Sequence, residues 1–389
     1  MSTLTKIAND IQFLAGTNIT RRYGTEGELL SCEYIRNRLL DMHLQPKIEP
    51  FTCSRETFQI LSLYWVEFVF VVLLSIFFPS AGLIYGSVVI ALYFLELLGY
   101  FSVSQFIPEY QSQNIHTVIK NQEEFDEPEY RIIFHANYDC GVFHLLYSSV
   151  VISYLPLLQN VVVMCMLTIL GVGLRDSIGE IIPWNDNISM TLWTVAGGTL
   201  GTLGLIVFIS TANEEDTRGA NFNASGVACL LALAEYYSQQ PLKDTEIHFI
   251  FTGAHECWMA GLRHFLKKNV FPKKRTLFIN IECVGSGDLH VVTRENMVFT
   301  FSIDNKIKKL IHKNSSLSEL SEIDSLPIPT SSYMILSHGY KACTLMGLDK
   351  DKKPPYRNQL EDTTLNVDEQ KVKKAFEITR TLAEAWINS

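Results

Sequence analysis

Two long segments with almost no charge constrain this chain more than any other feature of its sequence. In the first segment, residues 60–78 and residues 81–101 are apolar and carry one acidic residue each. Both stretches approach the roughly 20 residues that a helix needs to cross the hydrocarbon core of a bilayer. Only Pro79 and Ser80 separate them. The sequence therefore predicts a transmembrane helical hairpin over residues 58–106.

A second hairpin is expected over residues 141–210. Residues 142–174 are apolar apart from interruptions such as Pro156, a polar link follows at 175–187, and residues 188–209 carry no charge. Small residues let helices approach closely in lipid, and the last stretch has four glycines at near-helical spacing: Gly197, Gly198, Gly201 and Gly204. The alternative is a pair of buried core helices, but uncharged runs of this length are rare in soluble cores.

Acidic residues within these segments limit how the helices are placed. Glu67 and Glu96 should face protein or water or lie near an interface, because a carboxylate inside a bilayer is costly. The link at 175–187 carries three acids against one base, Arg175, and nearly all other Lys and Arg residues lie outside the segments. By the positive-inside rule we expect a multi-pass protein with about four spans, its polar part in the cytoplasm and its hairpin tips outside.

Charge and cysteine content narrow the remaining possibilities. The net charge of −9 argues against a nucleic-acid-binding surface, which needs clustered Lys and Arg. The eight cysteines include no C-x-x-C pair, which favours free thiols in a reducing compartment. Residues 1–56 are polar and amphipathic, so no signal peptide is expected there.

Removing the two segments leaves residues 1–57, 107–140 and 211–389, a normal size for one α/β domain. Short apolar runs that suit buried strands lie at 130–134, 247–251 and 277–281, and helical patterns lie at 225–237 and from residue 368 onward. This alternation predicts a mostly parallel or mixed sheet with helices on both faces. Sites in such sheets form at the carboxyl ends of the strands.

Five polar clusters occupy those strand ends or the helix starts beside them. They are HANYDCG at 135–141, RGANFNASG at 218–226, AHECWMAG at 254–261, IECVGSG at 281–287 and PYRNQLEDT at 355–363. With TRRYGTEGELLSCEYIRNRL at 20–39, QNIHTVIKN at 113–121 and YRIIFHANYD at 130–139, their order and spacing resemble the M28 family of zinc aminopeptidases and carboxypeptidases. The two hydrophobic segments look like insertions into that pattern.

The resemblance implies a dinuclear zinc site, and most of its residues are replaced here. The family's first ligand histidine falls on Asn137, its bridging aspartate on Phe222 and its last ligand histidine on Asn358. The glutamate general base falls on His255. The ligand carboxylates Glu256 and Glu282 are kept, as is Asp139, which orients the first ligand in the family.

These replacements predict that hydrolysis through two metals is lost. Phenylalanine cannot bridge zinc, and asparagine is a poor zinc ligand beside imidazole. A single-zinc site rebuilt from His255, Glu256, Glu282 and a cysteine (Cys140, Cys257 or Cys283) is the alternative. His135, two residues before Asn137, lies a step further back on the same side of its strand, and His338 is expected to serve a turn.

Three functions remain open on this basis. The first is a membrane-anchored pseudopeptidase, with no cofactor, that binds a peptide or a partner protein. The second is an active hydrolase with one zinc in a rebuilt site. The third is a membrane assembly or transporter-associated factor whose spans contact another membrane protein, an idea that rests on the four glycines. In each case the lipid bilayer is an expected partner.

Overall fold

The computed structural model describes every residue except 17–19, 55, 102–105, 107–108, 121–127, 149, 179–185 and 318–319. The chain forms two compact units. The first comprises Met1–Cys53, Glu109–Phe143 and Glu215–Ser389, and the second comprises Ser54–Pro108 and His144–Glu214.

An eight-stranded mixed sheet forms the centre of the first unit, with strand order β1-β2-β6-β3-β7-β12-β8-β11. The central strands β6, β3, β7 and β12 are parallel, whereas β1, β2 and β8 join the sheet through antiparallel pairing. The strands are β1 Lys47–Cys53, β2 Tyr110–Ile119, β3 Tyr130–Asn137, β6 Thr245–Thr252, β7 Thr276–Glu282, β8 Asp288–Val292, β11 Ser321–Ile323 and β12 Lys341–Leu348. The three runs predicted as strands lie within β3, β6 and β7, which confirms the α/β expectation.

Two short ribbons complete the strand inventory of the described residues. In one, β4 (Val142–Phe143) pairs with β5 (Glu215–Asp216), and in the other β9 (Arg294–Asn296) pairs with β10 (Thr300–Ser302). The short helical turns are η2 Leu145–Tyr147, η3 Val151–Tyr154, the π-helical η4 Ala220–Ala224, η5 Ser315–Leu317 and η6 Thr364–Asn366.

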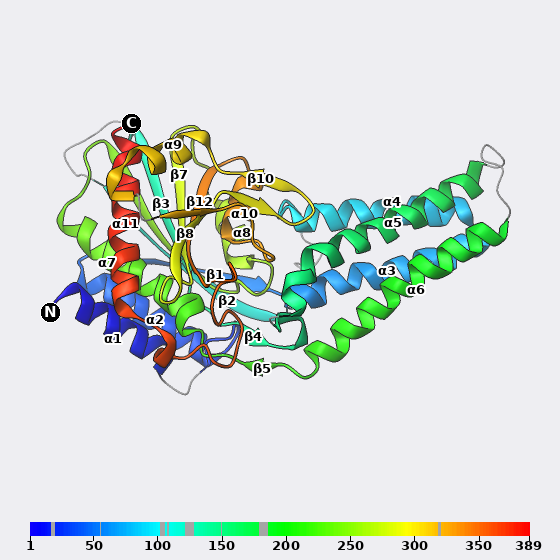
Figure 1. The fold of residues 1–389 in the computed structure, drawn as a ribbon, viewed down its shortest axis with the longest axis horizontal. Coiled ribbons are helices and arrows are strands. Elements are labelled where there is room, and N and C mark those ends of the chain that lie inside the picture. The colour runs from blue at the N-terminus through cyan, green and yellow to red at the C-terminus, as the bar shows by residue number, and fades with distance from the viewer. Residues whose placement is uncertain are drawn as a thin grey trace. The chain divides into compact units, whose positions relative to one another are not determined.

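Helices cover both faces of the large sheet. The main core lies on one face, between the sheet and five helices that are labelled in Figure 1. Alternate β3 side chains such as Ile132 and Phe134 join apolar residues from these helices. These helices are α1 Thr3–Gly16, α2 Glu26–Asp41, α7 Ser225–Gln239, α9 Asn305–Lys313 and α11 Glu369–Ile387. On the opposite face, Phe265 of α8 (Ala260–Lys268) meets the ring of His116 on β2. Ser332 of α10 (Ser331–Ser337) bonds Asn280 on β7 there.

The entry to α2 resembles a capping box with one change. The Thr25 hydroxyl accepts a hydrogen bond from the backbone N–H of Glu28 at 3.3 Å, as an N-cap residue does. The Glu28 carboxylate reaches the N–H of Gly24 at 2.7 Å rather than that of Thr25. Glu28 also accepts a hydrogen bond from the Ser112 hydroxyl on β2, so it ties the start of α2 to the sheet.

Four long helices form the second unit, in two hairpins. They are α3 Thr57–Phe77, α4 Pro79–Leu97, α5 Leu155–Ile178 and α6 Asp186–Thr211, and Figure 1 shows them running side by side. All four are long and apolar enough to cross a bilayer, judged by length and composition. The helices confirm the expected hairpins, while their insertion into a membrane stays a prediction.

The glycine stripe of α6 packs against α3 of the same chain. A Cβ atom added at three of the glycines would lie 3.1–3.4 Å from a valine methyl group: Gly197 meets Val72, Gly201 meets Val69 and Gly204 meets Val66. Gly198 meets nothing within 4 Å. The spacing that suggested a partner protein is therefore explained by a contact inside the bundle.

Two acidic side chains of the bundle have tyrosine partners. Glu96 is fully buried and accepts a hydrogen bond from the Tyr64 hydroxyl at 3.0 Å, so it faces protein as expected. Glu67 is exposed and accepts from the Tyr85 hydroxyl at 2.6 Å. Part of the acidic link used to predict the orientation, including Glu180, lies outside the described residues.

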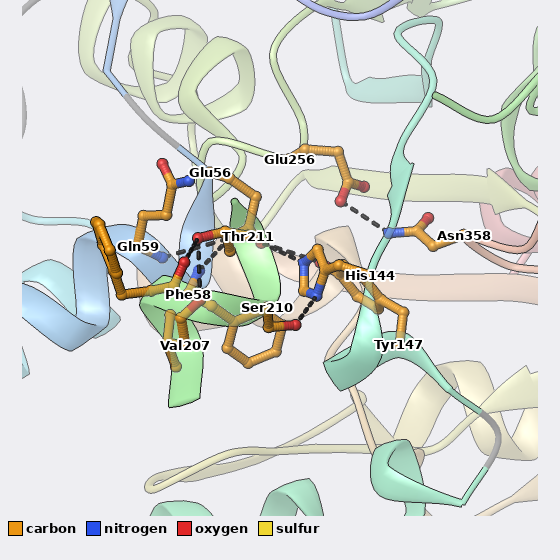
Figure 2. A network of polar contacts seen from close by, with 11 residues as sticks. Glu56, Phe58, Gln59, His144, Tyr147, Val207, Ser210, Thr211, Glu256 and Asn358 are labelled. Carbon is orange, nitrogen blue, oxygen red and sulfur yellow. Dashed lines mark hydrogen bonds and ion pairs between the residues drawn. The ribbon is translucent and has the colours of Figure 1, made fainter. Parts of the chain in front are cut away.

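A polar cluster joins the bases of the two hairpins. One carboxylate oxygen of Glu56 caps α3 by accepting from the N–H groups of Phe58 at 2.8 Å and Gln59 at 3.3 Å. The other oxygen accepts from the Tyr147 hydroxyl at 3.2 Å. His144 Nδ1 lies 3.3 Å from the Ser210 hydroxyl near the end of α6 (Figure 2). The cluster thereby links the segments that enter α3, precede α5 and leave α6.

Candidate functional site

The carboxyl ends of β3, β6 and β7 bring the predicted site residues together. Asn137 is the last residue of β3 and Glu282 the last residue of β7, and these strands are neighbours. The turn after β6 is held by Asp139, whose Oδ2 accepts the backbone N–H groups of His255 at 2.8 Å and Glu256 at 3.4 Å. Asp139 therefore fixes the loop that carries the retained carboxylate Glu256.

Asn358 contacts the retained carboxylate directly. Its side-chain amide donates a hydrogen bond of 2.9 Å to Oε2 of Glu256, which Figure 2 shows. Both side chains are buried, with Glu256 4% exposed. In the M28 pattern these two positions would be ligands of a metal, and here an amide donor occupies one of them.

Phe222 is fully buried at the position of the bridging carboxylate. Its backbone N–H donates to Asp362 at 3.0 Å and its carbonyl accepts the N–H of Cys283 at 3.3 Å, so η4 is pinned on both sides. The ring lies edge-on to His255, with centroids 5.7 Å apart. The Arg357 guanidinium carbon lies 4.7 Å from the centroid of the Phe222 ring. The Arg357 guanidinium therefore lies against the Phe222 ring at the position of the bridging carboxylate.

Backbone groups contact the side chains at two other ligand positions of the M28 pattern, Glu282 and Asn137. Glu282 Oε1 accepts the N–H of Ser331 at 2.9 Å, and the Asn137 amide lies 3.4 Å from the Asp139 carbonyl. Within the described part of the chain, Glu282 Oε2, Asn137 Oδ1 and Asp139 Oδ1 have no hydrogen-bond partner.

The cysteines proposed for a rebuilt zinc site make other contacts. Cys140 accepts the N–H of Arg21 at 3.1 Å, and Cys257 packs in an apolar cluster with Cys53. The Cys283 thiol donates to the Phe222 carbonyl, with Sγ and O 3.8 Å apart. Burial raises the pKa of Cys140 to about 12 and that of Cys283 well above its usual value, so both are neutral thiols in the metal-free protein.

His135 and His338 make hydrogen bonds to other groups of the fold. His135 bonds Asn280 Oδ1 at 3.0 Å through Nδ1 and Thr252 Oγ1 at 2.8 Å through Nε2, so both ring nitrogens are occupied. His338 ends α10 and bonds the Met334 carbonyl at 2.8 Å, which agrees with a turn role. Burial, with Arg357 nearby, lowers the pKa of His255 to about 3. A histidine with so low a pKa is neutral and is a weak base.

The donor set does not fit a zinc centre. Catalytic zinc takes three or more protein ligands from His, Cys, Asp or Glu. Among the residues that the structure describes, no three such side chains form a group able to hold an ion. Glu256 is bonded to an amide and Glu282 to a backbone N–H, with Phe222 at the bridging position.

Several loops at the site keep a left-handed backbone at residues other than glycine. Ala254 has φ +50°, Cys283 +52°, Tyr356 +63° and Asn358 +53°. Such conformations are unfavourable for these residues and persist where the surroundings fix them. The surroundings of these loops therefore fix the backbone that presents the site.

Three buried residues of the site were not found from the sequence. Arg21 joins the loops by donating to the carbonyls of Tyr138 at 3.1 Å and Gly219 at 2.9 Å. Asp362 holds η4, and Arg357 lies over Phe222. A signal for Arg357 was present, because it directly precedes Asn358 at the replaced ligand position.

Comparisons with known proteins agree with the fold. The model of peptidase family M28 matches residues 203–383. An aminopeptidase from Aneurinibacillus sp. strain AM-1 superposes with TM-score 0.54 at 16% identity, covering 98% of this chain and 93% of that one. A zinc aminopeptidase from Bacillus subtilis gives 0.54 at 13%, covering 98% and 94%. A glutaminyl cyclase from Bacteroides thetaiotaomicron gives 0.53 at 12%, covering 98% and 96%.

The fold is thus that of the zinc exopeptidases, as the sequence predicted. The family match and the shared fold together confirm the resemblance to peptidase family M28. A search of curated protein sequences gives no match to this chain.

Proposed function

We propose that this chain is a membrane-anchored M28 protein that binds a peptide or a partner protein and does not hydrolyse peptide bonds. The observation that carries the proposal is the hydrogen bond from the Asn358 amide to Glu256. An amide donor directed at the carboxylate satisfies it without a metal ion. The retained acid then serves the structure of the loop instead of chemistry.

The other groups that the family uses for hydrolysis are also replaced in this chain. Hydrolysis by this family needs an ion that polarises the carbonyl and activates water, with a carboxylate as general base. At the base position stands His255, whose low pKa leaves it a poor proton acceptor. The fold keeps the loops that would present a ligand, so binding without turnover is the function that we favour over a rebuilt zinc site.

Hydrolysis assays on the full chain in lipid nanodiscs test this proposal. Aminoacyl-naphthylamides and dipeptides would be assayed for the wild-type protein and for Glu256→Ala, with a known M28 aminopeptidase as positive control. We expect no turnover above that of the variant, with or without added zinc. Turnover by the wild-type protein that disappears in Glu256→Ala would contradict the proposal.

Anchoring by four spans, with the α/β unit in the cytoplasm, belongs to the same proposal. The four helices long enough to cross a bilayer support it. Cysteine labelling in intact cells tests the orientation in a Cys165→Ser background, because the other cysteines are buried. Asn187→Cys at the start of α6 should react with an impermeant reagent, and Lys313→Cys on α9 should react only after lysis. The reverse pattern would overturn the orientation.

Glu67 favours a second candidate function, assembly with another membrane protein. It lies ten residues from each end of α3, about 15 Å along the helix, and is exposed. A carboxylate at that depth is costly in lipid. A membrane helix of a partner with one Lys or Arg at mid-depth would compensate the charge.

A designed peptide tests this second candidate. Association of a single-span Leu-Ala peptide with one central Arg would be measured by energy transfer in vesicles, beside the same peptide with Leu. We expect only the Arg peptide to associate and Glu67→Leu to abolish its association. Equal signals from both peptides would contradict it.

A further inference from the structure

A pocket at the amino ends of β7 and β12 carries an excess of positive charge. Its volume is about 350 Å³, which lies within the usual range for small-molecule sites. The segment before β7, the segment that joins β10 to α9 and the turn between α10 and β12 form its walls. The charged residues of its lining are Lys273, Lys274, Lys341 and Asp304.

This pocket lies at the edge of the sheet opposite the candidate site. β7 begins at Thr276, directly after the segment that contributes two of the lysines, and ends at Glu282. The strand is seven residues long, so about 20 Å separate its two ends. The pocket is therefore not part of the candidate site, and an inference about it does not depend on the proposed function.

One aspartate accompanies three lysines in the lining. The Asp304 carboxylate is already engaged, because Oδ1 accepts the N–H of Lys306 at 2.7 Å and Oδ2 lies 3.3 Å from Nζ of Lys341. Lys273 and Lys274 pair with no carboxylate within the described part of the chain. The pocket thus keeps two ammonium groups without a counter-ion, although the whole chain has a net charge of −9. A local excess of this kind attracts anions.

A second pocket with two adjacent lysines provides a contrast. It lies along α11, has a volume of about 610 Å³ and is lined by Lys373 and Lys374. Glu377 lines the same pocket, with its carboxylate 3.7 Å from Nζ of Lys373. The lining of this larger pocket therefore supplies an acidic partner to one of its own lysines, which the pocket before β7 does not do for Lys273 or Lys274.

Gly339 and Tyr340 shape the wall beside Lys273. Gly339 has φ +78°, a conformation that glycine adopts readily, and a Cβ atom there would lie 3.2 Å from Nζ of Lys273. The Tyr340 hydroxyl accepts the N–H of Phe271 at 3.1 Å, and its ring packs on that of Phe278 with centroids 5.4 Å apart. The Lys273 ammonium lies 5.5 Å from the centre of the Tyr340 ring. The turn therefore places a cation beside a fixed aromatic ring and leaves room for it.

The chemistry of the lining suits a phosphate ester better than a carboxylate. Lysine binds phosphate as a point charge, whereas the planar fork of arginine matches a carboxylate, and the described lining residues include no arginine. A phosphate monoester carries about two negative charges at pH 7, which matches the two ammonium groups without a counter-ion. Phe301 and Leu336 add apolar surface for the organic part of the ester.

We propose that this pocket binds a phosphate monoester, with Lys273 and Lys274 contacting the phosphate and Tyr340 contacting the organic group. Phosphate monoesters occur both as soluble molecules and as headgroups of phosphorylated lipids. The pocket recognises the chemistry that the two sources share, and competition experiments separate the sources.

Fluorine NMR of the full chain in phosphatidylcholine nanodiscs tests the proposal, with 4-fluorophenyl phosphate as the probe. We expect the protein to broaden the fluorine line, empty nanodiscs to leave it sharp and excess inorganic phosphate to reverse the broadening. Lys273→Ala with Lys274→Ala should raise the Kd about tenfold, and arginine at both positions should retain most of the affinity. Both lysines are exposed, so an unchanged Tm verifies that the variants are folded.

Lys373→Ala with Lys374→Ala is the matched control, because it removes two adjacent lysines from the pocket on α11. We expect this variant to bind the probe with the wild-type Kd. The uncharged analogue 4-fluorobenzyl alcohol should not bind. Equal loss of affinity in the two double variants would show attraction to net charge alone and would overturn the proposal, as would broadening that neither variant changes.

Two competitors identify the source of the ester. Displacement of the probe by both glycerophosphoinositol 4-phosphate and vesicles of phosphatidylcholine with phosphatidylinositol 4-phosphate would support a lipid headgroup as the ligand. Displacement by the soluble compound alone would support a free phosphate ester. If neither competitor nor inorganic phosphate displaces the probe, the proposal is wrong.

Discussion

The side-chain amide of Asn358 donates a hydrogen bond of 2.9 Å to Oε2 of Glu256. The same positions in the M28 pattern are a histidine and a glutamate, and both are metal ligands there. With an amide in place of the histidine, the two side chains become a donor and an acceptor that contact each other.

The first prediction concerns this contact. Asn358→Asp should destabilise the α/β unit by about 2–4 kcal/mol at pH 8, because a second carboxylate would face Glu256 in a buried site. Aspartate tolerates the left-handed backbone of Asn358, so the effect reports on charge. Urea unfolding followed by tryptophan fluorescence measures it, and Glu256→Gln in the same chain should restore stability. Rescue by added zinc instead would show that a metal site is present.

A second prediction concerns the volume of the former metal site. Phe222→Ala should destabilise the protein by about 3–5 kcal/mol, the usual cost of truncating a buried aromatic residue. Phe222→Leu keeps most of the volume and should cost about 1–2 kcal/mol, including the lost cation–π contact. If Phe222 lined an open cleft instead, both variants would unfold at nearly the wild-type urea concentration.

The pH dependence of stability follows from Glu295. Burial raises the pKa of Glu295 to about 7, although hydrogen bonds from Thr330 oppose the shift. The folded state therefore binds a proton that the unfolded state releases near pH 4.5, so this group's contribution is full below pH 4.5 and is lost as the pH rises toward 7. The loss is on the order of 3 kcal/mol.

Glu295→Gln should remove that part of the pH dependence. Unfolding free energies measured from pH 4.5 to 8 should fall less steeply in the variant than in the wild-type protein. Glu377→Gln on α11 is the control and should leave the slope unchanged. Glu28, whose pKa burial also raises to about 7, contributes in the same direction and keeps some slope in the variant. Identical slopes for the wild-type protein and Glu295→Gln would contradict the assignment.

Two adjacent glycines of α6 give a prediction for the helical unit. A Cβ at Gly197 would lie 3.1 Å from a methyl group of Val72, whereas a Cβ at Gly198 meets nothing within 4 Å. Gly197→Leu should destabilise the bundle by about 1–3 kcal/mol through overpacking, and Gly198→Leu should cost little. Unfolding in sodium dodecyl sulfate, followed by Trp65 and Trp193 fluorescence, compares them. Equal midpoints would contradict the α3–α6 packing.

The central strands and the family could be predicted because their signals are local. Continuous apolar runs mark β3, β6 and β7, which are buried on both faces as parallel strands are. A polar motif follows each of these strands in the sequence, so the positions of the motifs in the fold could also be predicted. By contrast, β1 contains Pro50 and exposed residues, as an edge strand does, and its sequence resembles a loop.

The site could be predicted as a set of positions but not as a set of contacts. Sequence alignment with the M28 pattern located Asn137, Phe222 and Asn358, and the structure brings their segments to one edge of the sheet. The alignment could not show that Arg357 lies over Phe222, because the two residues are far apart in the chain and meet only through folding. The partner of the glycine stripe was missed for the same reason, since spacing alone does not identify the opposing helix.

The metal content of gently purified full-length protein tests the central claim most directly. Elemental mass spectrometry of detergent-purified wild-type protein would be run beside a Glu256→Ala, Glu282→Ala variant, both without a polyhistidine tag. The account predicts zinc well below one ion per chain in both samples. Near-stoichiometric zinc in the wild-type protein that is lost in the variant would contradict it, and would mean that the two retained carboxylates still bind a metal.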